Sequence, residues 1–186
     1  LDNMEDWNTL EKYGQALLKT NRFPEAIDIY SRLIDECPDN VEYYFNLGDS
    51  YYNLSDYSNA IENYKRILIF DDENYTVLLK IGILLNQLNK FNEAEKYLND
   101  AIHCGNPNKE LLIQLGMSYG GQQKFLQSLE AFKEALSLSL NDPVIHYQLG
   151  IIYKELEIYN LAIEEFNQYL TKNSNDYIAY YLIGNS

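Results

Sequence analysis

Apolar residues recur along the chain at intervals of three and four positions, and polar residues fill the positions between them. Near the start, Leu10, Tyr13 and Leu17 share one helical face. A polar break at residues 20–22 follows. The apolar spacing then resumes at Phe23, Ala26, Ile27, Tyr30 and Leu33. The pattern predicts two helices joined by a tight turn, each with one apolar face.

This hairpin pattern repeats with a fixed step of 34 residues. Six of the nine glycines lie on the step: Gly14, Gly48, Gly82, Gly116, Gly150 and Gly184. A small residue stands twelve positions after each of the first five: Ala26, Ala60, Ala94, Ser128 and Ala162. A bulky residue stands sixteen positions after: Tyr30, Tyr64, Leu98, Phe132 and Phe166. Because glycine within a helix costs about 1 kcal/mol relative to alanine, we expect it to meet the small residue and let the paired helices approach closely.

The step and the motif around each glycine resemble the tetratricopeptide repeat. Leu47-Gly48, then Tyr51, Tyr57, Ala60 and Tyr64, match that motif in one repeat. The resemblance covers one array over residues 1–186, with repeats at 7–40, 41–74, 75–108, 109–142 and 143–176 and a further first helix at 177–186. The chain departs from the family where a tryptophan is common, four residues before the glycine, and only Pro38 keeps the proline that closes a repeat. The resemblance implies an all-α fold: an α-solenoid of antiparallel helix hairpins, wound into a right-handed superhelix whose first helices line a concave groove.

Helical phase selects the residues that would face this groove. The positions three before and one after each glycine form an apolar stripe: Phe45, Leu79, Ile83, Ile113, Met117, Tyr147 and Ile151. The position two before each glycine carries hydrogen-bond donors: Lys12, Asn46, Lys80, Gln114 and Gln148. An exposed apolar stripe marks an interaction site, and the donors would hold the backbone of an extended segment. The alternatives are that the superhelix or a missing segment covers the stripe, and that the donors are ordinary solvated positions.

Charge narrows the choice of partner. The formal net charge is −14 and the sequence pI is about 4.4, and an acidic surface repels both nucleic acid and anionic lipid. Along the groove positions, five acids and four bases nearly cancel. We therefore expect the acidity on second helices, edges and loops, and we expect neither nucleic acid nor a membrane as the partner.

The sequence offers little catalytic chemistry. His103 adjoins Cys104 without further ligands at metal-binding spacing, and His146 occupies a packing position. Neither a phosphate loop nor a nucleophile elbow is present, so we expect no enzyme activity, no metal and no cofactor. Cys37 and Cys104 are expected to be unpaired, buried thiols in a reducing compartment. We therefore expect a cytoplasmic location, and the start at Leu1 without methionine indicates an excised piece of a longer chain.

The sequence thus favours a scaffold or adaptor that binds an extended peptide or an amphipathic helix, apolar in part. A second interpretation is the substrate-recruiting arm of a multidomain enzyme such as a transferase. A third is a homo-oligomer formed through the sixth first-helix, which we expect to expose Tyr180 and Ile183. In the fourth repeat, Gly120-Gly121 and Ser128 predict the loosest packing.

Overall fold

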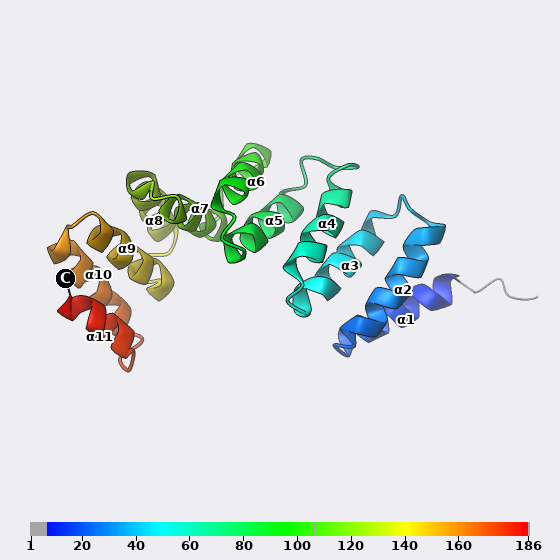
Figure 1. Ribbon diagram of the computed structural model, residues 1–186, viewed down its shortest axis with the longest axis horizontal. Helices are drawn as coiled ribbons and strands as arrows, with labels where there is room; N and C mark the ends of the chain where they lie inside the picture. The colour runs from blue at the N-terminus through cyan, green and yellow to red at the C-terminus, as the bar shows by residue number, and fades with distance from the viewer. Residues whose placement is uncertain (1–6, 106, 186) are drawn as a thin grey trace, which may run out of the picture. The chain divides into compact units, whose positions relative to one another are not determined.

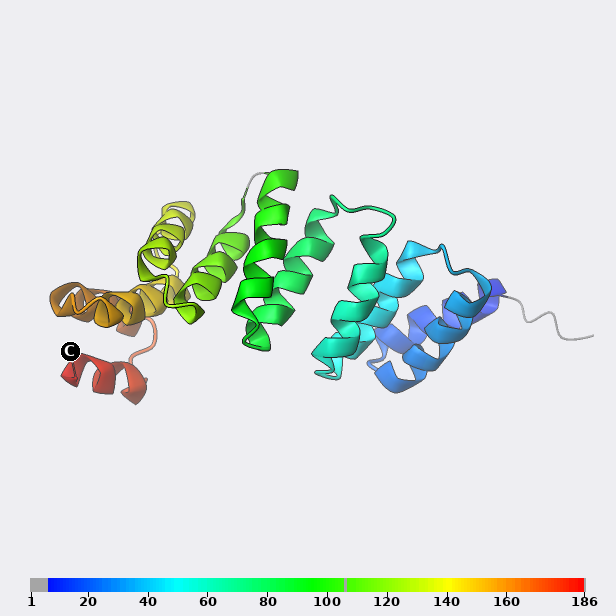
Figure 2. The same cartoon turned by 45° about the horizontal axis from the view of Figure 1, so that its top comes forward.

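The computed structural model describes residues 7–105 and 107–185. Within these ranges the chain forms eleven α-helices and no β-strand (Figures 1 and 2). In chain order the helices are α1 (Trp7–Lys19), α2 (Phe23–Glu36), α3 (Val41–Asn53), α4 (Tyr57–Ile67), α5 (Tyr75–Gln87), α6 (Phe91–Cys104), α7 (Lys109–Gly121), α8 (Phe125–Leu138), α9 (Pro143–Glu155), α10 (Tyr159–Leu170) and α11 (Tyr177–Gly184). The expected all-α class is confirmed. Helices packed in pairs are α1–α2 and α3–α4 in unit 1, which ends at Leu84, and α7–α8 and α9–α10 in unit 2, which begins at Leu85, and α11 packs against α10.

Polar side chains fix where several first helices of the pairs begin. The Asn40 side chain accepts a hydrogen bond from the Glu42 amide at 3.0 Å, and Asn108 caps α7 in the same way. Asp142 caps α9, and its hydrogen bond to Lys109 lowers the pKa of the Asp142 carboxyl. Asp176 caps α11. Such caps satisfy amide groups that have no partner within the helix.

All five first helices that continue into a second helix end in the same way. One residue of each turn has a left-handed backbone, with φ between 57° and 61°: Asn21, Ser55, Asn89, Gln123 and Glu157. The next residue's amide returns to a carbonyl five positions earlier, as in the 2.8 Å bond from Ile158 to Tyr153. This arrangement is a Schellman motif, which turns the chain sharply into the second helix.

The chain divides into two compact units within α5. Unit 1 runs to Leu84, and its core includes Leu17, Tyr30 and Leu47 from α1, α2 and α3. Unit 2 begins at Leu85, and its core includes Phe132 and Phe166. Each unit therefore buries aromatic side chains of second helices against first helices.

The ladder glycines make room for those aromatic rings. A β-carbon at Gly48 would lie 2.6 Å from the Tyr64 ring, and one at Gly116 would lie 2.7 Å from the Phe132 ring. We expected the glycine to meet the small residue of the second helix, but it receives the bulky residue four positions later. The small positions, such as Ala60, are fully buried instead. The hydroxyl of Ser128, in the fourth repeat, donates a 2.7 Å hydrogen bond to the Gly116 carbonyl.

Two expectations about buried side chains are wrong. Tyr13 was assigned to the apolar face of α1, yet 46% of its surface is exposed. No described helix precedes α1 to cover that side. Cys37 is exposed rather than buried because it lies just beyond the end of α2. Cys104, also expected to be buried, is half-buried, and neither cysteine forms a disulfide with another described residue.

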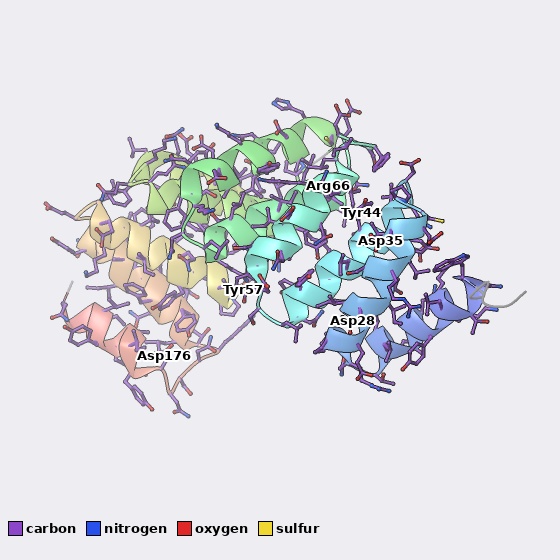
Figure 3. All side chains as sticks on the ribbon, turned by 45° about the vertical axis from the view of Figure 1, so that its right-hand side comes forward. Asp28, Asp35, Tyr44, Tyr57, Arg66 and Asp176 are labelled. Atoms are coloured by element: carbon purple, nitrogen blue, oxygen red, sulfur yellow. The ribbon has the colours of Figure 1, made fainter. Side chains whose placement is uncertain are left out.

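Two exposed acidic side chains lie on the same side of α2. Figure 3 labels Asp28 and Asp35 on α2, and Asp35 lies seven residues after Asp28. Residues at this spacing share one side of a helix.

Candidate functional site

Unit 2 carries a hollow between α7 and α9, which we call the α7–α9 hollow. Its volume is about 470 Å³. From α7 it is lined by Gly116, Met117, Gly120 and Gly121. From α9 it is lined by Gln148, Ile151 and Glu155. The rings of Phe91, Phe125 and Phe132 form further parts of its wall.

Missing side chains on α7 create this hollow. The two positions at the end of α7 are glycines, whereas the equivalent positions of α9 hold Lys154 and Glu155. A β-carbon at Gly121 would lie 2.4 Å from the Phe91 ring, so the ring of the preceding second helix occupies that space. Gly121 is therefore a packing requirement, and both glycines line the hollow.

The chemistry of the hollow is apolar with a polar rim. Met117 is 37% exposed, and Gln148 and Ile151 are half-buried. Glu155 is the single charged side chain among the described residues that line it. The surface suits an apolar side chain that is followed by a hydrogen-bonding or basic group.

A buried amide network supports the wall behind the hollow. The Asn86 amide donates to the Gln114 carbonyl at 2.8 Å and to the Gln114 side chain at 3.0 Å. The Ser118 hydroxyl donates to the Asn86 side-chain oxygen at 2.7 Å. Asn86 and Ser118 are both buried, so these bonds satisfy polar groups that water cannot reach. The network holds the last turn of α5 against α7.

Unit 1 carries a smaller aromatic and charged cluster. Lys80 Nζ lies 2.9 Å from Asp49 Oδ1 and 5.2 Å from the centre of the Phe45 ring. Tyr64 donates its hydroxyl hydrogen to the same carboxylate. Burial, and then this hydrogen bond, raises the pKa of Tyr64. Beside the cluster lies a cavity of about 120 Å³ lined by Tyr52, Ile83 and the Lys80 side chain.

Three sequence models of repeat families match the chain. One is described as TPR repeat and covers residues 14–55. Two are described as Tetratricopeptide repeat and cover residues 41–74, and 75–102 with 110–142. The chain belongs to the tetratricopeptide-repeat family.

Solved tetratricopeptide-repeat structures share the fold at low sequence identity. The part of MamA from position 41 to the end, from Desulfovibrio magneticus RS-1, superposes with a TM-score of 0.85 at 19% identity, over 94% of this chain and 99% of that chain. YrrB, described as "a TPR protein with an unusual peptide-binding site", gives a TM-score of 0.83 at 20% identity, over 96% and 92%. No match was found among curated proteins. The likeness confirms the solenoid fold.

Within this tetratricopeptide-repeat array, three of the predicted groove residues line the hollow: Met117, Gln148 and Ile151. Three others do not line it. Ile113 is only 6% exposed and belongs to the core of unit 2, and the Gln114 amide is bonded to Glu110 and Asn86. The Tyr147 ring packs at a tilt of 54° against that of Tyr169, with 5.0 Å between the ring centres.

Of the predicted groove residues of unit 1, some line the small cavity and others do not. Lys80 and Ile83 line the small cavity, and Phe45 packs beside it against Tyr64. Asn46 and Leu79 are half-buried and line neither described cavity. The predicted groove residues therefore differ widely in exposure, from the buried Ile113 to Met117 at 37%.

Sequence reasoning missed several residues of this surface. Gly120 and Gly121 were interpreted only as a source of loose packing, yet they shape the hollow. Tyr181 occupies the stripe position three before Gly184 and is strongly exposed, but the stripe was followed only as far as α9. Applying the same phase to Gly184 would have found it.

The two histidines differ in their surroundings: His103 is exposed in the last turn of α6, whereas His146 is engaged in packing. His146 Nδ1 lies 2.6 Å from Glu165 Oε2, and its Nε2 lies 3.3 Å from the Leu140 carbonyl, which ties α9 to α10 and to the preceding turn. Across residues 7–105 and 107–185, no group of three or more His, Cys, Asp and Glu side chains is placed to hold a metal ion. Nor does any helix in these ranges have the length and apolar character needed to cross a membrane.

Proposed function

We propose that the chain is an interaction scaffold that binds a segment of another protein in the α7–α9 hollow. The supporting observation is the hollow itself, in which the Gly120-Gly121 backbone leaves Met117 and Ile151 accessible beside Gln148. An apolar side chain of the partner enters over the glycines, and the Gln148 amide binds the partner's backbone. Proteins of this family are typically scaffolds without catalytic activity.

The charge of the hollow specifies the partner further. Glu155 lies at its edge with no basic residue among the described lining residues to neutralise it. A lysine, an arginine or a free amide N–H next to the apolar residue would complement this carboxylate, whereas an acidic neighbour would be repelled. The partner is therefore an extended peptide or one turn of an amphipathic helix with an apolar and a basic residue close together. The peptide-binding site for which YrrB is described is consistent with this mode.

In unit 1, we assign a second contact surface to Phe45, Asn46, Leu79, Lys80 and Ile83. Its small cavity accepts a side chain of limited size, and Lys80 is partly exposed above it. We expect weaker binding at this surface than in the α7–α9 hollow, because Asp49 already neutralises the charge of Lys80.

A pull-down from an extract of the source cell tests the proposal with a matched pair of variants. Met117→Glu places a charge in the hollow, and Leu161→Glu places the same charge on α10 at a side chain of nearly equal exposure, 38% against 37%. Partners retained by the wild type and by Leu161→Glu but lost by Met117→Glu support binding in the hollow. Retention of the same partners by all three proteins contradicts it. Ile113→Glu is unsuitable because a charge buried at that position would unfold the protein.

A peptide display library tests the expected chemistry independently. Selection against the wild type should enrich peptides with a basic residue beside an apolar one, and Glu155→Gln should remove the basic preference while keeping the apolar one. Enrichment of acidic peptides would contradict the assignment of Glu155.

Two other roles follow from the sequence. A substrate-recruiting arm of a larger enzyme would use the same hollow, and the full reading frame distinguishes it by revealing a catalytic domain. The other role is self-association through the sixth first-helix.

A further inference from the structure

Unit 2 has a second hollow, between the second helices α6 and α8, which we call the α6–α8 cleft. Its volume is about 240 Å³. The buried residues that line it are apolar: Leu112 and Leu115 of α7 and Ala131 of α8. The half-buried Ile102 and Tyr119 also line it. Pockets for small molecules begin at about 300 Å³, so this cleft has room for one long side chain.

The small size of Ala131 helps to keep this space open. Ala131 stands fifteen positions after Gly116. The equivalent position of every other complete repeat holds a larger side chain: Ile29, Asn63, Tyr97 and Glu165. A side chain of that size on α8 would fill part of the cleft.

The charged side chains that line the cleft are both acidic. Glu130 and Glu134 are exposed and lie four residues apart on α8, a spacing that places their β-carbons about 5–6 Å apart. The other polar lining residues, Asn99 and Gln127, are neutral. Within the described residues, neither carboxylate forms an ion pair with a basic side chain.

The nearest lysines of α8 and its preceding turn have other contacts. Lys124 Nζ lies 2.8 Å from Glu95 Oε2. Lys133 Nζ lies 5.7 Å from the centre of the Tyr153 ring. The two carboxylates of the cleft therefore remain available to a cation from outside the chain.

The pair of like charges distinguishes α8 from the other second helices. The same two positions hold opposite charges in the first three repeats and one acid with a neutral amide in the fifth: Asp28 and Arg32, Glu62 and Arg66, Lys96 and Asp100, and Glu164 and Gln168. Opposite charges four residues apart stabilise a helix, whereas like charges destabilise it. An added cation would relieve this repulsion in α8.

We propose that the α6–α8 cleft binds an arginine side chain of a partner protein. The aliphatic part of the arginine packs on Leu112, Leu115 and Ala131, as long basic side chains do on apolar surfaces. Its guanidinium group donates hydrogen bonds to the carboxylates of Glu130 and Glu134. Arginine is favoured over lysine because its planar group presents several donors at once and is more weakly hydrated.

This inference goes beyond the proposed function, because it adds a second binding site on other residues. The α6–α8 cleft shares no lining residue with the α7–α9 hollow. The formal net charge of −14 favours the approach of a basic partner segment to either site.

An NMR titration with two short peptides tests the cleft directly. The probe is acetyl-Ala-Leu-Arg-Leu-Ala-amide, and its control carries citrulline, which has nearly the same shape without the charge, in place of arginine. The arginine peptide should shift the amide signals of Glu130, Ala131 and Glu134. The citrulline peptide should bind there about tenfold more weakly, because it loses the charge-assisted hydrogen bonds.

A matched pair of variants tests the carboxylates. Glu130→Lys gives α8 the opposite charges that α6 already has at these positions, so the variant should fold at least as well as the wild type. It should weaken binding of the arginine peptide about tenfold or more, because the new cation repels the guanidinium group. Glu164→Lys makes the same change in net charge at the equivalent exposed position of α10 and should bind like the wild type.

Ala131→Leu tests the apolar part of the cleft without changing the charge. The larger side chain occupies the space next to Leu112 and Leu115 and should also weaken binding about tenfold. Circular dichroism checks that each variant keeps the helicity of the wild type.

Three results overturn the inference: no shifts at the cleft, equal binding of the arginine and citrulline peptides there, or equal binding by Glu130→Lys and Glu164→Lys. Shifts confined to Met117, Gln148 and Ile151 would also overturn it, since they place the peptide in the α7–α9 hollow and support the proposed function instead. Conversely, loss of partners in the pull-down with Met117→Glu does not depend on the α6–α8 cleft.

Discussion

The ring of Tyr64 lies on Gly48 so closely that a β-carbon there would be 2.6 Å from it. Gly48→Ala must displace a fully buried ring and should lower the free energy of unfolding by about 1–3 kcal/mol. Gly184→Ala, where the space is open, should leave it unchanged or raise it by up to about 1 kcal/mol. Urea unfolding followed by circular dichroism measures both. Equal effects at the two glycines would show that helix propensity, and not ring packing, governs the ladder.

Tyr30 and Tyr64 occupy the same position of successive repeats but differ in whether the hydroxyl group has a hydrogen-bond partner. Tyr64 donates to Asp49, whereas the buried Tyr30 hydroxyl has no partner among the described residues. Tyr30→Phe should therefore raise the free energy of unfolding by about 1 kcal/mol, and Tyr64→Phe should lower it by about as much. Chemical denaturation of the two variants provides the comparison. Destabilisation by both would mean that the Tyr30 hydroxyl has a bonding partner after all.

Burial, followed by the negative charges of Glu42 and Glu11, raises the pKa of Tyr30 from 10.0 to about 12. The folded state then holds the phenol proton after the unfolded state has released it. Stability should be complete below pH 10 and should fall as the pH rises toward 12. Thermal unfolding across this range should show a shallower decline in Tyr30→Phe than in the wild type. Identical slopes would contradict the shift.

The left-handed turn residues predict stabilising substitutions. Glu157 has a φ of 61°, a conformation that costs a residue with a side chain about 1–2 kcal/mol. Glu157→Gly removes this cost and should raise the free energy of unfolding by about 0.5–1 kcal/mol after the greater flexibility of glycine in the unfolded chain is counted. Glu164→Gly, at an exposed position within α10, is the control and should lower it by about 1 kcal/mol. A loss of stability in Glu157→Gly would argue that the side chain has a structural role.

The fold could be predicted because periodic spacing reports helix faces directly. The residues of the first repeat already separate the buried Leu17 and Leu33 from polar positions, and the recurrence of Gly14 every 34 residues fixes the pairing of helices. Spacing predicts on which side of a helix a residue lies. It does not predict how much of that side the next helix covers. Ile113 was expected to be accessible, but it is packed in the core with Leu149.

The hydrogen-bond partners of individual side chains were also hard to predict from the sequence. Whether a buried tyrosine is satisfied depends on one residue of the facing helix, which is Asp49 for Tyr64. The same position in the first repeat is Gln15, whose amide bonds to Glu11 at 3.4 Å instead. Such pairings depend on small differences in distance, and a sequence pattern does not contain them.

Gly120 and Gly121 should follow different evolutionary paths although they are neighbours. At Gly121 any side chain collides with the Phe91 ring, so drift at this position requires a compensating change in the preceding repeat. At Gly120 a β-carbon would lie 3.3 Å from the flexible end of Ile152, which can move aside. A side chain at Gly120 can therefore reduce the depth of the α7–α9 hollow without rebuilding the array and, under the proposed function, change which peptide fits there.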